Sequence, residues 1–213
     1  MSDMGSPALI HQPREKDQAI VAFDFDGTLT VSDSFTRFLR WRAGAGGWFG
    51  GLARMAPDLV GYVGHRDRGR LKAASVRQFL RGTPRTQLEA DAEAFAGQVW
   101  PGFIRYDALA CWQDWGKKGA YRVIVTASPE TTVAPFARRL GAEALLGTQL
   151  VFAADDRVAG AFATANCRGE EKVRRLRAAF GEDMRLAAAY GDTTGDTEML
   201  AMADEAGFRR FKG

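Results

Sequence analysis

The stretch AIVAFDFDGTLT, residues 19–30, decides the fold, because it joins an apolar run to two carboxylates and a glycine. Residues 20–23 are apolar without strict alternation, which is typical of a strand buried on both faces of a parallel sheet. Open α/β sheets bind ligands at the carboxyl ends of such strands. Asp24 and Asp26 follow the run, and Gly27 lets the chain turn away from it.

Residues i and i+2 of an extended strand point to the same side, so we expect Asp24 and Asp26 to face one metal ion or one substrate. A strand that simply ends in a capped turn would leave the same pattern. Complementary chemistry elsewhere in the chain has to decide between these two interpretations.

Composition excludes several classes of protein. The chain has 213 residues, of which 46% are hydrophobic and 26% charged, values that disagree with a disordered or low-complexity protein. The longest uncharged runs are too short to span a bilayer. Residues 1–18 are polar and lack the apolar core of a secretory signal, so we expect a flexible tail on a cytoplasmic protein.

Charge is distributed unevenly. Residues 36–85 hold eleven basic and two acidic residues, although the net charge of the whole chain is only +3. A basic segment beside an acidic site indicates an anionic partner, such as a phosphate ester, nucleic acid or acidic lipid. An arginine-rich helical surface in contact with water is the alternative. The segment contains no nucleic-acid recognition motif, so we expect no specific nucleic-acid partner.

The order of patterns predicts an α/β fold with a doubly wound parallel sheet and a helical insertion after the first strand. Helical spacing dominates residues 34–100, and strand and helix patterns alternate from residue 120 onward. We therefore expect a flexible tail over 1–18, a catalytic core over 19–33 and 101–213, and a helical cap over 34–100. The sequence predicts a hairpin or a flap around residues 155–157 and a last strand over residues 207–211.

Later strand ends and helix starts carry chemistry that complements the two aspartates. A strand over residues 121–125 ends in Thr126 and Ser128, whose hydroxyls can hold phosphate oxygens. Lys172 opens a predicted helix and can neutralise a phosphoryl group. Asp192 and Asp196 follow another strand. Asp24, Asp26 and Asp192 together suit Mg²⁺, which prefers oxygen ligands.

These residues resemble the haloacid dehalogenase (HAD) superfamily of phosphohydrolases. The resemblance covers residues 20–200, nearly the whole chain, and is closest to the phosphoserine-phosphatase-like branch, subfamily IB, with a type 1 helical cap. The matching positions are Asp24-Phe25-Asp26-Gly27-Thr28, Thr126, Lys172, and Gly191-Asp192 through Asp196.

The resemblance implies a Mg²⁺-dependent phosphatase. Asp24 would be the nucleophile that forms an aspartyl-phosphate, and Asp26 would protonate the leaving alcohol and then activate water. The Asp26 backbone carbonyl would join Asp24 and Asp192 around the metal. The presence of Asp26 favours phosphoryl transfer over dehalogenation, because a haloacid has no oxygen leaving group that needs an acid.

The resemblance also implies supporting roles. Thr126, with Ser128, would bind the phosphoryl oxygens, and Lys172 would hold both Asp24 and the transferred group. Asp196 would orient Lys172 or metal-bound water. A fold that has lost turnover and serves as a binding or regulatory module is the alternative of a different class.

The sequence does not decide between several phosphate esters as the substrate. Phosphoserine phosphatases carry glutamate where this chain has Asp33, and the Thr126-Ala127-Ser128-Pro129 stretch also departs from their pattern. This stretch and residues 167–172 look closer to the phosphatidylglycerophosphatase C type, so we expect a small phosphate ester or an anionic lipid head group.

The basic segment suggests further contacts. Its arginines alternate with aromatic residues, namely Trp41, Trp48, Phe49 and Tyr62. Peripheral contact with the inner face of an anionic membrane is one interpretation of this pattern, and packing inside the cap is the other. Arg54, Arg70 and Lys72 are candidates for contact with a substrate anion. The sequence does not predict the oligomeric state.

Overall fold

The fold is organised on a five-stranded sheet in the order β3-β2-β1-β6-β7, in which every neighbouring pair is parallel. The computed structural model describes residues 10–57 and 68–213. The five strands are β1 (Ile20–Phe23), β2 (Tyr121–Pro129), β3 (Ala144–Thr148), β6 (Leu186–Gly191) and β7 (Ala203–Phe208). The predicted first strand therefore occupies the centre of the sheet.

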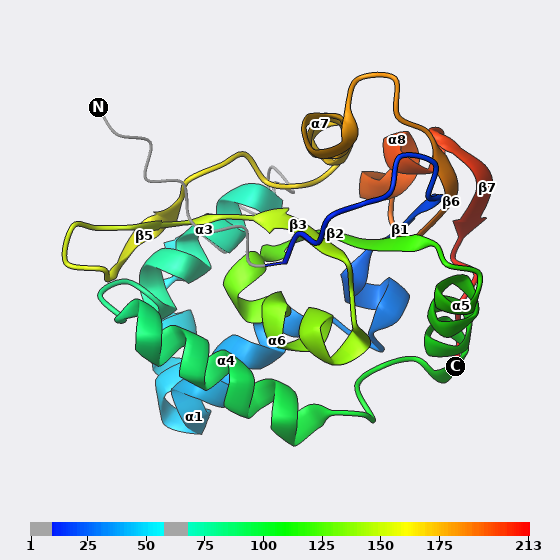
Figure 1. Ribbon diagram of the computed structural model, residues 1–213. Helices are drawn as coiled ribbons and strands as arrows, with labels where there is room; N and C mark the ends of the chain where they lie inside the picture. The colour runs from blue at the N-terminus through cyan, green and yellow to red at the C-terminus, as the bar shows by residue number, and fades with distance from the viewer. Residues whose placement is uncertain (1–9, 58–67) are drawn as a thin grey trace.

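Both faces of the central strand are buried, as its continuous apolar run predicts. Val21 and Phe23 pack in one hydrophobic cluster, and Ile20 and Ala22 pack in a second cluster on the other face. Helices α7 (Glu170–Phe180) and α8 (Thr197–Leu200) cover the second cluster, and α5 (Tyr106–Lys117) and α6 (Glu130–Leu140) cover the first (Figure 1). The predicted doubly wound α/β fold is confirmed.

The segment between β1 and β2 is helical in the part that the structure describes. It begins with a short helical turn, η1 (Phe25–Leu29), followed by α1 (Ser34–Arg54), α3 (Arg68–Phe79) and α4 (Arg85–Val99). Gly44, with φ of 64°, kinks α1, because this left-handed conformation interrupts the helix and favours glycine. Helix α4 begins at Arg85, directly after Pro84, which has an extended conformation at the N-cap.

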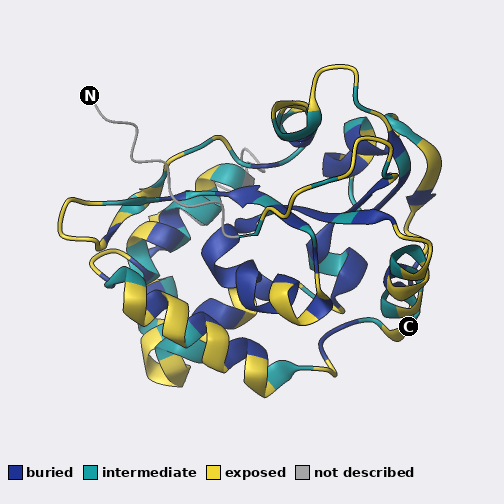
Figure 2. Cartoon of the chain, in the orientation of Figure 1, coloured by how far each residue is buried: buried dark blue, intermediate teal, exposed yellow. Residues whose placement is uncertain are grey.

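The sides of α1 and α4 that face each other and α6 are buried, and their outer sides are exposed (Figure 2). Phe95 of α4 packs against Phe38 of α1 and Phe136 of α6, so one apolar cluster runs from the sheet into this helical segment (residues 34–100). Its designation as a separate cap with those boundaries stays a prediction. Tyr62 and the rest of residues 58–67 lie outside the described residues.

A hairpin of β4 (Leu150–Phe152) and β5 (Val158–Phe162) confirms the predicted hairpin and holds the turn between α3 and α4. Gly82 N donates to Val158 O at 2.8 Å, and Val158 N donates to Thr83 O at 2.9 Å. The guanidinium of Arg85 lies 3.6 Å from the centre of the Phe152 ring. This hairpin therefore connects the core of the protein to the turn that follows α3.

Two details differ from the sequence prediction. The last strand is Ala203–Phe208 and not 207–211, because Phe211 packs on Phe23 and Tyr190 after the strand has ended. Residues of the predicted loose tail also contact the sheet, since Gln12 N donates to Glu143 O at 2.8 Å and Leu145 N donates to Ile10 O at 3.1 Å. Within the described ranges, no helix is long and apolar enough to cross a membrane.

Candidate active site

The candidate site is a cavity of about 260 Å³ at the carboxyl ends of β1, β2 and β6, where an open α/β sheet binds its ligands. Strand β1 delivers Asp24 to this edge, and the Asp24 N–H donates to Tyr190 O of β6 at 2.8 Å. The cavity is lined by Asp24, Asp26, Gly27, Asp33, Lys72, Ala127, Asn166, Arg168, Asp192 and Thr193.

Lys172 is the centre of a buried ionic cluster below the cavity. It belongs to the first turn of α7 and is only 1% exposed. Its Nζ donates to Asp24 Oδ1 at 2.6 Å, to Asp196 Oδ1 at 2.7 Å and to Val125 O at 2.6 Å. An ammonium has three donors, so these three bonds satisfy the buried cation completely.

Burial and charge act against each other in this cluster. Burial raises the pKa of Asp24 to about 7, although the nearby charge of Lys172 opposes the shift. Burial also disfavours the charged form of Lys172, but Asp24 and Asp196 outweigh it and raise the lysine pKa. For Asp196, Lys172 and hydrogen bonds from Thr193 overcome burial and lower the pKa. Lys172 is therefore charged.

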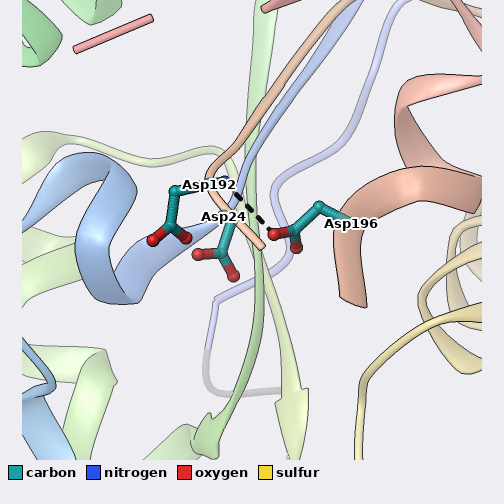
Figure 3. A group of neighbouring side chains, drawn as sticks. All are labelled: Asp24, Asp192 and Asp196. Carbon is teal, nitrogen blue, oxygen red and sulfur yellow. Dashed lines mark hydrogen bonds between the residues drawn. The ribbon is translucent and has the colours of Figure 1, made fainter. Parts of the chain in front are cut away.

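Asp24, Asp192 and Asp196 each offer a carboxylate oxygen within 4.8 Å of the others, and Figure 3 shows them together. Asp196 is already occupied: besides Lys172, it accepts from Asp192 N at 3.2 Å, from Thr193 N at 2.9 Å and from Thr193 Oγ1 at 3.0 Å. Among the three, Asp24 and Asp192 line the cavity. They fit a divalent cation best.

Gly27 is required for the approach of Asp192. A Cβ atom on residue 27 would lie 2.4 Å from Asp192 Oδ2, and φ of Gly27 is +84°, a left-handed value that favours glycine. Burial and the charge of Asp196 raise the pKa of Asp192, because negative charge accumulates here. A bound cation would relieve that accumulation.

Asp26 lines the same cavity, as predicted, but its carboxylate lies outside the group of three. Strand β1 ends at Phe23, so the i, i+2 rule for extended chains does not apply to the turn that follows. Asp26 Oδ1 accepts from Ser34 N at 2.7 Å, and Oδ2 accepts from Ser128 Oγ at 2.5 Å. Burial and nearby Asp33 raise the pKa of Asp26, whereas Lys72 lowers it.

The two predicted hydroxyl residues, Thr126 and Ser128, are both buried but have different hydrogen-bond partners. Thr126 is fully buried and does not line the cavity, and its Oγ1 accepts from Ser128 N at 3.0 Å. Ser128 is also fully buried, and its hydroxyl contacts Asp26. Asp33 lines the cavity while its Oδ1 accepts from Thr36 N at 2.7 Å, which caps α1.

Two cations extend the site beyond the aspartates. Lys72 of α3 was a candidate for anion contact and does line the cavity, unlike Arg54 and Arg70. Arg168 lines it as well, although the sequence analysis assigned it no role. Its Nη2 donates to Thr194 Oγ1 at 2.9 Å.

Arg168 lies against Gly195, where a Cβ would come within 2.5 Å of Arg168 Cγ. In the sequence, the only feature that pointed to Arg168 as a site residue was its position four residues before Lys172. Asn166, Ala127 and Thr193, which also line the cavity, gave no comparable signal.

The fold and this site define a hydrolase of the haloacid dehalogenase type. The family model for haloacid dehalogenase-like hydrolases matches residues 21–201, and the chain belongs to this family. Its place is in the phosphoserine-phosphatase-like branch.

The chain is similar to two proteins of known sequence and to one solved structure, among others. CicA of Caulobacter vibrioides is 59% identical over 194 residues, which cover 91% of this chain and 87% of CicA. A phosphoserine phosphatase of Halobacterium salinarum is 30% identical over 192 residues, 88% of this chain and 83% of that protein. A solved structure of a Bordetella pertussis protein with unknown function has a TM-score of 0.74 at 22% identity and covers 89% and 88% of the two chains.

Proposed function

We propose that the protein is a Mg²⁺-dependent phosphomonoesterase that works through an aspartyl-phosphate on Asp24. The observation that carries the proposal concerns the Asp24 carboxylate. Its Oδ1 accepts from Lys172 Nζ at 2.6 Å, and Asp24 lines the same cavity as Asp26 and Asp192. A nucleophile, an acid and a metal-ligating carboxylate around one small cavity are the parts that phosphoryl transfer to a carboxylate requires.

The first step forms a bond between an Asp24 oxygen and phosphorus and breaks the bond from phosphorus to the alcohol oxygen. The Asp26 carboxyl gives its proton to that oxygen, and the alcohol leaves. In the second step the Asp26 carboxylate takes a proton from water, whose oxygen attacks phosphorus. The bond to Asp24 then breaks, and phosphate is released. The positive charge of Lys172, held against Asp24, offsets the charge on the transferred group through Asp24, whereas Thr126 is buried outside the cavity and supports the site through its bond with Ser128 N.

Asp24 and Asp192, with the backbone carbonyl of Asp26, would hold the magnesium ion. When bound, the ion neutralises phosphoryl charge and orients the phosphoryl group against Asp24. Asp196 supports the site indirectly, because its oxygens are occupied by Lys172 and by residues of its own turn. Its role is to orient Lys172.

The cavity favours a small anionic phosphate ester. Its volume of about 260 Å³ lies below the roughly 300–1,000 Å³ of pockets for drug-sized ligands. Lys72 and Arg168 line it, and neither forms an ion pair within the described residues. Two cations at one cavity favour a substrate that carries negative charge beyond the phosphoryl group.

Phosphoserine is the second candidate substrate, because Asp33 also lines the cavity and could bind an ammonium group. An anionic lipid head group satisfies the same two cations. Membrane contact has less support, since Trp41 packs on Phe95 and Trp48 stacks on Phe79, although Phe49 is 66% exposed. Flotation with anionic vesicles tests that contact, and absence of binding would remove it.

The direct test is phosphate release from 4-nitrophenyl phosphate with and without magnesium. We expect activity that depends on magnesium and falls to background in Asp24→Asn. Equal activity of that variant would overturn the nucleophile assignment, and a complete lack of activity in the wild-type protein would favour a non-catalytic module. A screen of phosphorylated amino acids, sugars, nucleotides and lipid head groups then identifies the substrate class.

A further inference from the structure

A chain of hydrogen bonds connects helix α3 with the carboxylate of Asp26. Lys72 Nζ lies 3.4 Å from Ser128 Oγ, and Ser128 Oγ lies 2.5 Å from Asp26 Oδ2. The other Asp26 oxygen accepts from Ser34 N, the first residue of α1, at 2.7 Å. Both oxygens of the carboxylate are thus held, and two of the three groups involved come from the helical segment.

The direction of these bonds follows from the groups themselves. An ammonium can only donate, so Ser128 Oγ accepts from Lys72, and a hydroxyl has a single hydrogen to give. That hydrogen goes to Asp26, because an ionised carboxylate can only accept, and a carboxyl that carries the proton for the leaving oxygen keeps acceptor capacity for the Ser128 hydroxyl. Ser128 is 0% exposed, so bulk water does not compete for its hydroxyl. Its single donor is therefore committed to Asp26 and not to a phosphoryl oxygen.

We propose that Ser128 and Lys72 are positioning residues that fix the Asp26 carboxyl for proton transfer to the leaving oxygen. This inference rests on the proposed phosphatase function and replaces the expectation that Ser128 binds the phosphoryl group. Proton transfer requires the acid within hydrogen-bond reach of the leaving oxygen, and small displacements of a catalytic group are costly. Lys72 acts through Ser128, so its effect depends on the serine hydroxyl.

The test compares two esters that differ in their need for an acid. Phenyl phosphate releases a poor leaving group, whereas 4-nitrophenyl phosphate releases a good one, and neither ester carries a charge outside its phosphoryl group that Lys72 could bind. The parameter kcat/KM covers the steps up to release of the phenol. The ratio of the two kcat/KM values does not depend on how much of a variant is folded.

We expect Ser128→Ala to lower kcat/KM for phenyl phosphate about tenfold more than for 4-nitrophenyl phosphate, a part of the roughly 10²–10⁴-fold that acid–base catalysis contributes. Lys72→Met gives a smaller change in the same direction. The double variant matches Ser128→Ala within about a factor of two, because the two residues act in series. Two control variants leave the ratio unchanged: Ser75→Ala, which removes a hydroxyl bonded within α3, and Lys117→Met, which removes a surface charge.

Three outcomes would overturn the inference. An equal loss on both esters would assign Ser128 to the phosphoryl group, and an unchanged ratio would leave it without a part in proton transfer. Additive effects of the two substitutions would show that Lys72 does not act through Ser128. If the wild-type protein hydrolysed neither ester, the proposed function itself would fall, and this inference with it.

Discussion

The carboxylates of Asp24 and Asp26 stand two residues apart in sequence but are held by different parts of the molecule. Asp24 is fixed by Lys172 of α7, which also contacts Val125 of β2 and Asp196, so its surroundings belong to the sheet and its packed helices. Asp26 is fixed by Ser34 of α1 and by Ser128, which Lys72 of α3 supports. Among the residues that the structure describes, the helical segment thus contacts the surroundings of the Asp26 carboxylate and not those of Asp24.

This difference separates two requirements of the proposed reaction. Attack by Asp24 would depend on the buried ionic cluster that Lys172 forms between α7 and the sheet. Proton transfer by Asp26 depends on where α1 and α3 lie, and these helices also present Asp33 and Lys72 to the cavity. A change in the helical segment should therefore alter substrate preference and acid catalysis together, while leaving the nucleophile in place.

The largest expected effect is that of Lys172→Met. Removing the cation leaves Asp24 and Asp196 buried and unpaired, and breaking a buried ion pair in this way costs about 3–5 kcal/mol. We expect that loss in the free energy of unfolding, measured in urea, together with activity at background. Arg174→Met on the same helix is the control, because Arg174 pairs at the surface with Glu171. Stability unchanged from the wild type would show that the cluster does not hold the sheet edge.

Asp26→Asn should impair catalysis strongly and stability only slightly. Its catalytic loss should be large, roughly 10²–10⁴-fold in kcat, because the amide cannot serve as an acid. Its effect on unfolding should stay within about 1 kcal/mol, since the amide oxygen can still accept from Ser34 N. Urea unfolding and steady-state kinetics of the same preparation measure both quantities. A large loss of stability would mean that Asp26 is structural, and the contrast with Asp24 would disappear.

Magnesium should stabilise the Asp24 side of the site by mass action. At about 100 times its dissociation constant, a ligand that binds only the folded state adds about 2.7 kcal/mol. We expect magnesium to raise the melting temperature of the wild-type protein and not that of Asp192→Asn. Asp204→Asn, at a surface pair with Arg185, is the matched control and should keep the shift. The same shift in both variants would place the ion away from Asp192.

Much of this architecture could be predicted because its signals are local. The buried run of β1 and the helix of residues 170–180 appear in the sequence as continuous patterns, and the strand ends carry Asp24, Thr126 and Asp192 to one edge. The β7 strand was predicted too late because Asp204 and Glu205 lie exposed on the sheet edge and give no apolar pattern.

The contacts of Ser128, Lys72 and Arg168 could not be predicted in the same way. The bond from Ser128 to Asp26 joins residues 102 positions apart, and the contact of Lys72 with Ser128 depends on how α3 packs over the sheet edge. Arg168 reaches the cavity only because Gly195 leaves room for its side chain. Such placements arise from tertiary packing, which composition and periodicity do not encode.

Gly27→Ala is expected to have the smallest effect that still distinguishes the two carboxylates, since residue 27 follows Asp26 in the chain and its backbone lies against the Asp192 side chain. The left-handed conformation costs a residue with a Cβ atom about 1–2 kcal/mol, and the new methyl would come within 2.4 Å of Asp192 Oδ2. We therefore expect a modest loss of stability, and a weaker magnesium response because Asp192 is displaced. Gly102→Ala is the control, because a Cβ there meets no atom within 4 Å. Equal magnesium responses in these two variants would show that the approach of Asp192 to Gly27 has no part in metal binding.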